Sequence, residues 1–373
     1  MNRKKSFLVI AIILILSISS LYGCGDRDSH ALKEDQATLS IGDGTEIQKV
    51  GKIQVIATLF PQYDFAKIVG GERAEVSLLL LPGVEAHSYD PKPSDMIKMS
   101  KADMLIYTGK YMEPWSERVF QGLDNFHGIL VDVSEGIPLS YITGQEEYHH
   151  HDEVSNYGEA YNFDAEHYHG ETHNHAKAHH HNEPHQQEHL EEGQHQHLEY
   201  EPHIWTDPKM AMIMVDNIVE GFCEIDPEYA EEYRLNGENY KIELAKLHEE
   251  FKKIVQNGRQ RDMVFGSRFA LYYFTKQYGL GYCAAFDSCS SETEPSAKAI
   301  ASIIKKIKEE DIKVIYYGEL SDQRIAEAIG QQTGAKPLLF HSCHNVSKEE
   351  FEEGATYLSL MRQNAANLKE GLK

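Results

Sequence analysis

Short apolar runs rich in β-branched residues alternate with segments of helical periodicity along most of this 373-residue chain. Residues 53–59 form the first such run, and Pro61 then begins a helical pattern that stops at Gly70-Gly71. Strands that alternate with helices form parallel sheets covered by helices on both faces. With 41% apolar residues, the chain can fill real hydrophobic cores. The alternation therefore predicts an α/β fold.

The alternation runs through two blocks of sequence. The expected strands are residues 53–59, 75–81, 104–107 and 128–133 in the first block, and 262–265, 281–286, 314–317 and 337–340 in the second. The expected helices are residues 61–69, 94–101 and 113–123 in the first block, and 269–278, 295–309, 322–333 and one from about 348 in the second. We therefore expect two lobes, each a parallel sheet flanked by helices.

A long helical pattern separates the two blocks. A shorter helix is expected from Asp207-Pro208 to about Cys223, and after Asp226-Pro227 the pattern continues to about Gln256. Its apolar positions recur at helical spacing: Tyr233, Tyr240, Leu244, Leu247, Phe251 and Ile254. About 30 helical residues span about 45 Å at about 1.5 Å per residue, which is more than one small domain needs. We predict that this long, rigid helix joins the two lobes; a coiled-coil arm is the alternative.

A histidine-rich, acidic segment interrupts the pattern after the fourth strand. Of the 21 histidines in the chain, 14 lie between His149 and His197, and residues 144–201 hold 14 acidic residues but one basic residue, Lys177. Such a composition cannot form a core, so we predict a disordered insertion. Its imidazoles suit transition metals such as zinc, and the absence of cysteine argues against a thiolate site. A linker without a metal role is the alternative.

The N-terminus has the pattern of an export signal. Three basic residues at positions 3–5 precede an apolar run over residues 7–16, and Leu21-Tyr22-Gly23-Cys24 follows. These four residues resemble a bacterial lipobox, so we predict a cleaved signal peptide at residues 1–23, lipidation of Cys24 and a flexible tether at 24–50. The protein would then act outside the cytoplasm, lipid-anchored to the bacterial cell membrane. Plain secretion is the alternative.

Charge and motifs exclude several functions. A net charge of −23 leaves little to neutralise phosphates, so nucleic acid is not expected as a partner. The chain holds no P-loop, no Gly-x-Ser-x-Gly and no Gly-x-Gly-x-x-Gly. Nucleotide binding and hydrolase chemistry therefore have no support in the sequence.

Histidines outside the insertion are candidate metal ligands. Ligands of open α/β sheets gather beyond the carboxyl ends of the strands. His87 follows a predicted strand in a loop stiffened by three prolines and a glycine, and His341 follows another, with His344 three residues on. His203 lies between the insertion and the bridging region. A single loop histidine is more often only solvated or hydrogen-bonded, so none of these residues is decisive by itself.

Four motifs occur in a recognisable order. They are Pro82-Gly-Val-Glu-Ala-His-Ser-Tyr-Asp-Pro-Lys-Pro-Ser-Asp95, His203-Ile-Trp-Thr-Asp-Pro208, Tyr273-Phe-Thr-Lys-Gln-Tyr-Gly-Leu280 and Thr293-Glu-Pro-Ser296. From about Ile53 to its C-terminus, the chain strongly resembles the cluster A-I solute-binding lipoproteins of zinc and manganese ABC transporters. The resemblance implies two α/β lobes joined by one rigid helix, with the metal in the cleft between them. A long acidic, His-rich loop before the second histidine is typical of the zinc-specific branch.

The resemblance also implies which residues hold the metal. His87 and His203 match the first two histidine ligands of the family. The third ligand position falls at Arg268, and a guanidinium stays protonated and has no acceptor, so it cannot ligate. The fourth position falls near His341, which we expect to supply the third imidazole. Arg268 is expected to pair instead with an acid that lines the cleft.

The expected metal site is therefore His87, His203 and His341, completed by water or by a nearby group such as His344, Glu319 or a histidine of the insertion. Three imidazoles and one oxygen fit tetrahedral Zn(II) better than Mn(II), which prefers more oxygen ligands. Because neutral imidazole is the ligating form, zinc affinity is expected to fall as the pH drops through about 6.5.

The sequence thus predicts a zinc-capture protein and not an enzyme. A monomeric extracytoplasmic lipoprotein would bind Zn(II) as its transported ligand and deliver it to the membrane permease of an ABC transporter. The insertion would act as an accessory zinc collector. A surface adhesin or metal-sensing lipoprotein is the alternative. A zinc enzyme has less support because the chain has no His-Glu-x-x-His motif.

The expected domains follow from these boundaries. They are a lipoprotein signal peptide at residues 1–23, a tether at 24–50, an N-terminal α/β lobe at 51–206 with the disordered insertion at 144–201, a bridging helical region at 207–258 and a C-terminal α/β lobe at 259–373.

Overall fold

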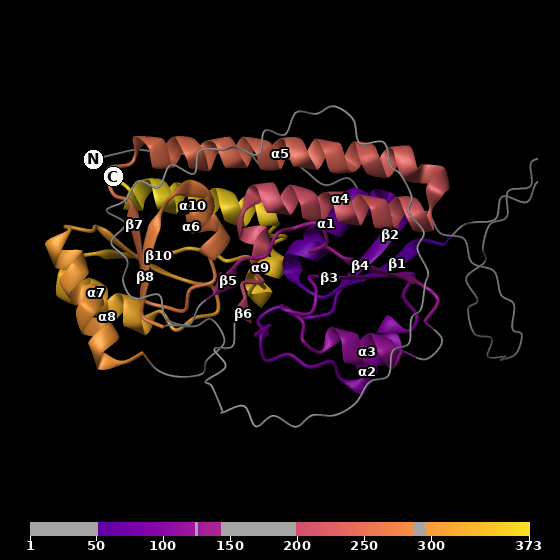
Figure 1. Cartoon of the computed structure of the whole chain (residues 1–373), viewed down its shortest axis with the longest axis horizontal. Coiled ribbons are helices and arrows are strands. Elements are labelled where there is room, and N and C mark those ends of the chain that lie inside the picture. The colour runs from indigo at the N-terminus through magenta and orange to yellow at the C-terminus, as the bar shows by residue number, and fades with distance from the viewer. Residues whose placement is uncertain (1–50, 124–125, 143–198, 287–294) are drawn as a thin grey trace, which may run out of the picture. The chain divides into compact units, whose positions relative to one another are not determined.

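A computed structural model describes residues 51–123, 126–142, 199–286 and 295–373 of the chain (Figure 1). All of these described residues belong to one compact unit. The expected signal peptide, the lipid site Cys24, the tether and nearly all of the His-rich insertion lie outside the described residues. None of the described helices is long and apolar enough to cross a membrane.

The N-terminal lobe is built on a parallel sheet with the strand order β2-β1-β3-β4. Its strands are β1 (Ile53–Ala57), β2 (Ala74–Leu78), β3 (Met104–Tyr107) and β4 (Ile129–Asp132). In register, Val55 of β1 lies between Val76 of β2 and Met104 of β3. The continuous apolar character of these strands fits a sheet that is buried on both faces.

Helices cover both faces of this sheet. On one face lie α1 (Phe60–Gly70), which the 3-10 turn η1 (Gly71–Arg73) follows, and α4 (Pro208–Ile225). On the other face, α2 (Pro93–Met99) and α3 (Ser116–Gln121) cover a smaller apolar cluster that includes Leu105 and Trp115. The lobe is therefore a three-layer α/β unit, as the sequence predicts.

The C-terminal lobe repeats this architecture with the parallel strand order β10-β9-β7-β8. Its strands are β7 (Asp262–Phe265), β8 (Gly281–Ala284), β9 (Val314–Tyr317) and β10 (Lys336–Leu339). The helices α7 (Ala297–Glu309) and α8 (Arg324–Thr333) pack on one face through an apolar cluster that includes Ile303 and Ile315. The helices α6 (Tyr272–Tyr278) and α10 (Tyr357–Gly371) lie on the other face. Each strand expected from the sequence is present; β3, β7 and β9 have the predicted bounds, and the ends of the others differ by one to three residues.

The predicted bridging helix is α5 (Ala230–Asn257), which the 3-10 turn η3 (Pro227–Tyr229) precedes (Figure 1). Its 28 residues span about 42 Å. It contacts α1 and α4 of the N-terminal lobe and α6 and α10 of the C-terminal lobe. Its buried side chains are Tyr233, Tyr240, Leu244, Leu247, Phe251 and Val255, together with Gly237. The prediction that a long helix joins the lobes is confirmed.

A second helix also ties the lobes together. The single C-terminal helix expected from about residue 348 is divided into α9 (Lys348–Glu352) and α10, with Gly354 at φ +78° between them. At the start of α10, the Tyr357 N–H donates to Asp64 Oδ2 of α1 at 2.9 Å, and the Tyr357 hydroxyl donates to the Trp205 carbonyl at 2.6 Å. The lobes therefore share one core across two helices and are not linked by α5 alone.

The ends of the His-rich insertion are held together by a short antiparallel pair. β5 (Tyr141–Ile142) pairs with β6 (Glu199–Tyr200), with Tyr141 opposite Tyr200. Glu201 and His203 follow β6 directly, and the 3-10 turn η2 (Ile204–Thr206) comes next. Residues 199–201, which the sequence analysis assigned to the insertion, are thus part of the folded lobe.

Candidate metal centre

Three histidines from three loops meet where the two lobes face each other. His87, His203 and His344 each offer a ring nitrogen, and these three atoms lie within 4.8 Å of one another. The Nε2 atoms of His87 and His203 are 3.2 Å apart, and the ring centroid of His344 is 4.7 Å from each of the other two. The N-terminal lobe supplies His87 and His203 and the C-terminal lobe supplies His344, so the cluster requires both lobes.

The loop that carries His87 is fixed by the opposite lobe. The side-chain amide of Asn345, which is buried, donates to the carbonyls of Leu81 and Val84 at 2.8 Å each. The Gly83 N–H, in a turn at φ +82°, donates to the Val346 carbonyl at 2.8 Å. The residues next to His344 therefore hold the loop of His87 in place.

His203 is oriented by a carboxylate two residues before it. Its ring is fully buried, its Nδ1 forms a short hydrogen bond with Glu201 Oε1, and its backbone N–H donates to the same oxygen at 3.1 Å. Burial raises the pKa of Glu201, but the charge of His203 and the hydrogen bonds to it outweigh burial and lower that pKa overall. A carboxylate on Nδ1 leaves Nε2 free to face His87, which is the usual arrangement around metal-bound histidines. Glu201 is not among the site residues predicted from the sequence, where its one signal is its position two residues before His203.

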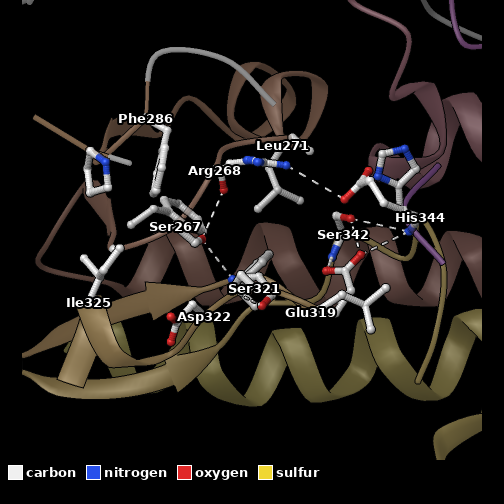
Figure 2. A pocket seen from close by; sticks show the side chains of 18 of the residues that line it. Ser267, Arg268, Leu271, Phe286, Glu319, Ser321, Asp322, Ile325, Ser342 and His344 are labelled. Atoms are coloured by element: carbon white, nitrogen blue, oxygen red, sulfur yellow. Dashed lines mark hydrogen bonds and ion pairs between the residues drawn. The ribbon is translucent and has the colours of Figure 1, made fainter. Parts of the chain in front are cut away.

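Two side chains orient His344: Glu319, which Figure 2 shows beside it, and Trp205. Glu319 accepts from the Ser342 N–H at 2.7 Å, from the Ser342 hydroxyl and from the His344 N–H at 3.3 Å. The indole N–H of Trp205 donates to the Ser342 carbonyl at 2.7 Å, and the indole lies 5.3 Å from the His344 ring. The carboxylate of Glu319, a candidate fourth ligand, therefore accepts hydrogen bonds from the loop that carries His344.

The structure does not bring His341 into this cluster. His341 is 1% exposed, its Nδ1 accepts from the Cys343 N–H at 2.8 Å, and its backbone exchanges two 2.7 Å hydrogen bonds with the Asn364 side chain. The backbone then turns at Cys343, which adopts φ +61°, so that His344 faces the cleft while His341 stays in the C-terminal lobe. The third imidazole therefore comes from His344, which the sequence offered only as a fourth ligand.

Burial favours the neutral imidazole at two of the three histidines, His87 and His344. Burial, followed by the charge of His203, lowers the pKa of His87 to about 4. Burial and the charges of His203 and His87 lower the pKa of His344 well below its usual value. Neutral imidazole is the form that binds a metal, so His87 and His344 are already in their ligating state at neutral pH.

The geometry of the cluster fits a tetrahedral metal. Two nitrogens bound to one zinc ion at about 2.0–2.1 Å lie about 3.3 Å apart, and His87 and His203 present their Nε2 atoms 3.2 Å apart. The buried Nε2 of His344 has no hydrogen-bond partner in the described part of the chain. An unpartnered buried nitrogen is costly unless a ligand occupies it. All three donors are imidazoles, which suits zinc and disfavours the hard cations Mg²⁺ and Ca²⁺.

Arg268 lies in the wall of a cavity that adjoins the cluster (Figure 2). The cavity has a volume of about 670 Å³, and His87 and His344 line it together with residues of the C-terminal lobe. Arg268 Nη1 lies 3.9 Å from Glu85 Oε2. The expectation that Arg268 pairs with an acid lining the cleft is confirmed.

Comparison with known protein families matches nearly the whole folded part of the chain. The model of the family described as "ZnuA: Zinc-uptake complex component A periplasmic" matches residues 55–371. The high-affinity zinc uptake system protein ZnuA of Bacillus subtilis is 29% identical over 329 residues, which cover 88% of this chain and 90% of that protein. The zinc-binding lipoprotein AdcA of Streptococcus pneumoniae strain R6 is 27% identical over 323 residues, which cover 87% of this chain and 56% of AdcA. The chain thus spans about half the length of AdcA.

A solved structure shares the fold. The metal-dependent lipoprotein YcdH from Bacillus subtilis superposes with a TM-score of 0.65 at 26% sequence identity, and the match covers 86% of this chain and 100% of that one. The two-lobe architecture predicted from the resemblance is confirmed. Because the family match extends over most of its length, the chain belongs to the ZnuA family, the periplasmic component A of zinc-uptake complexes.

Proposed function

We propose that this protein captures Zn(II) outside the cytoplasm with His87, His203 and His344 and delivers it to the membrane permease of an ABC transporter. One observation carries the proposal: three imidazole nitrogens from two lobes converge within 4.8 Å. The zinc-uptake description of the family and the names of the zinc-binding relatives support the choice of metal.

Zinc capture of this kind requires no covalent bond to be formed or broken. The three neutral imidazoles replace water around the ion, and the Glu201 carboxylate on His203 Nδ1 strengthens that imidazole as a donor. Two helices tie the lobes, so a wide hinge motion would break contacts such as that of Tyr357 with Asp64. Rearrangement of the loops that carry His87 and His344 is therefore the favoured route for zinc entry and release.

We further propose that a lipid on Cys24 holds the protein at the cell membrane and that the His-rich insertion collects zinc near the site. The lipoprotein name of AdcA supports the anchor. His203 follows closely on the last histidine of the insertion, His197, which supports a high local zinc concentration beside the cluster. Metabolic labelling with palmitate tests the anchor: the intact chain should incorporate label and Cys24→Ala should not.

The zinc site is tested by replacing one ligand at a time. His344→Ala and His87→Ala should each weaken the tightest zinc binding step by about 10²-fold or more, because two imidazoles remain. His127→Ala is the matched control, since His127 is an exposed histidine of the N-terminal lobe outside the cluster. Competition with a chromophoric zinc chelator measures the affinity. Unchanged affinity in His344→Ala would refute the site.

A further inference from the structure

The cluster supplies three zinc ligands and leaves one position open. Among the described residues, the metal-binding group consists of His87, His203 and His344 alone. Zinc in proteins is usually four-coordinate, and an open position is filled by water or by an entering group. His87 and His344 both line the adjoining cavity, so an entering group would approach from there.

The cavity is much larger than a zinc ion and one water need. Its volume is about 670 Å³, whereas a water molecule takes about 30 Å³ in the liquid. Pockets that hold small organic molecules fall in the range of about 300–1,000 Å³. Apolar side chains of Leu271, Phe286 and Ile325 and the hydroxyl-bearing Ser267 and Ser321 line it. The charged residues Glu85, Glu319, Asp322 and Arg324 also line the cavity. Apolar walls with polar groups between them are typical of a small-molecule site.

Arg268 gives the cavity a positive group that points toward the cluster. Figure 2 shows its guanidinium directed across the cavity to the side on which His344 lies. The one ion pair of this guanidinium in the described residues, with Glu85, is long at 3.9 Å, and both side chains remain partly exposed. A cation beside a zinc site is unfavourable unless an anion lies between them.

Hydrogen bonds hold the backbone of Arg268 at the edge of the cavity. The Ser267 hydroxyl accepts from the Gly318 N–H at 3.0 Å and donates to the Arg268 carbonyl at 3.1 Å. Both residues follow β7, and Gly318 follows β9, so the arginine projects from the carboxyl ends of two paired strands. A guanidinium fork binds carboxylates in a bidentate manner, which an ammonium group cannot do.

We infer that the cavity binds a small carboxylate chelator whose carboxylate pairs with Arg268 and whose nitrogen or oxygen donor fills the fourth zinc position. The protein would then take up zinc together with a molecule of the amino-acid or hydroxycarboxylate class. The bound anion separates the two cations and replaces water as the fourth ligand. This inference rests on the proposed zinc site and adds its co-ligand.

Equilibrium dialysis of the full chain with one equivalent of radioactive zinc and labelled L-histidine tests the inference, with labelled citrate as a second arm. The wild type should retain at least one of the two chelators in a 1:1 ratio with cluster-bound zinc, and the zinc-free protein should retain neither. Arg268→Gln should keep the zinc but bind the chelator roughly ten- to hundred-fold more weakly. Arg268→Lys should recover only part of that loss, because it keeps the charge but not the fork.

Two control variants separate the cavity from the rest of the chain. Arg234→Gln removes an exposed arginine of α5 that pairs with Glu231, and it should retain zinc and chelator as the wild type does. His344→Ala disrupts the cluster, so the zinc and chelator that it still retains measure binding by the His-rich insertion. This amount is subtracted from the amount that the wild type retains.

The outcomes distinguish the inference from the function on which it rests. Retention of zinc without either chelator in the wild type, or equal chelator retention in Arg268→Gln, would overturn the inference and leave the zinc site intact. No difference in zinc retention between the wild type and His344→Ala would instead overturn the zinc site itself.

Discussion

The Nε2 atoms of His87 and His203 lie 3.2 Å apart, with the ring of His344 within 5 Å of both imidazoles. This spacing is close to that of two nitrogens on one tetrahedral zinc ion. The loops that carry these histidines come from both lobes, and the Asn345 side chain joins two of them by hydrogen bonds. The site is therefore a product of how the lobes are joined, and several consequences can be measured.

The pH dependence of zinc binding should differ from that of free imidazole. Because the pKa of His87 is lowered to about 4 and that of His344 is also depressed, protons compete with zinc for these two imidazoles only in acid solution. In a variant without the insertion, affinity should stay nearly constant from pH 8 to about 5 and fall toward pH 4. The ordinary pKa of histidine, used in the sequence analysis, predicts instead a decline through about pH 6.5. A decline that begins near pH 6.5 would contradict the effect of burial on these two imidazoles.

Protonation of His87 also determines how the free energy of unfolding of the metal-free protein changes as the solution becomes acidic. The folded pKa of His87 lies below the value of about 6.5 that an unfolded chain has. Between these values the unfolded state binds more protons, so the free energy of unfolding should decrease as the pH falls from 6.5 to 4. Urea unfolding at several pH values measures this, and His87→Gln should show a shallower decrease than the wild type.

Glu201→Gln should weaken zinc binding without removing a ligand. The amide can still contact His203 Nδ1 but does not carry the charge that makes the imidazole a stronger donor. Replacing such partners costs about 10- to 100-fold in metal affinity. Competition titration measures the change, with Glu135→Gln as the control because Glu135 is an exposed acid of the same lobe. Equal affinity in Glu201→Gln and the wild type would show that the carboxylate only orders the loop.

Asn345→Ala should accelerate zinc release in addition to destabilising the fold. It removes two hydrogen bonds that hold the loop of His87 from the opposite lobe. Asn217→Ala is a matched control, since that amide also donates to two carbonyls, those of Val133 and Glu135, but within the N-terminal lobe. Each variant should lose about 1–3 kcal/mol of stability. Stopped-flow release of zinc to a chelator should be faster only in Asn345→Ala; identical release rates in the two variants would exclude the tethering role.

Removal of residues 146–196 should leave the fold and the tight zinc site unchanged but lower the zinc stoichiometry. The flanking strands β5 and β6 already pair, so a short connection can join them. Calorimetry should find one tight zinc equivalent in both forms and further weak equivalents only in the full chain. A single equivalent in both forms would exclude the insertion as a zinc collector.

Much of the fold could be predicted because its signals are local. In the sequence, β3 is visible as an apolar run, and α5 is visible in the seven-residue spacing of Tyr233 and Tyr240. Each pattern arises within a single strand or helix. The contact of Tyr357 with Asp64 joins residues 293 positions apart, and no periodicity indicates such a pair. The second link between the lobes was missed for that reason.

The site shows the same division between local and long-range information. His87 and His203 could be found because each stands in a distinctive motif. The choice between His341 and His344 depends on the left-handed backbone at Cys343, and spacing from the strand does not determine that turn. The role of Glu201 depends on a hydrogen bond that forms only when β6 brings the segment back to the lobe.

The most direct test of the central claim is a crystal structure of the zinc-loaded protein with the metal located by anomalous scattering at the zinc edge. We predict one strong peak at about 2.0–2.1 Å from Nε2 of His87 and His203 and from a ring nitrogen of His344. A peak bonded to His341, or zinc bound to the folded lobes with any of these three imidazoles unligated, would contradict the account.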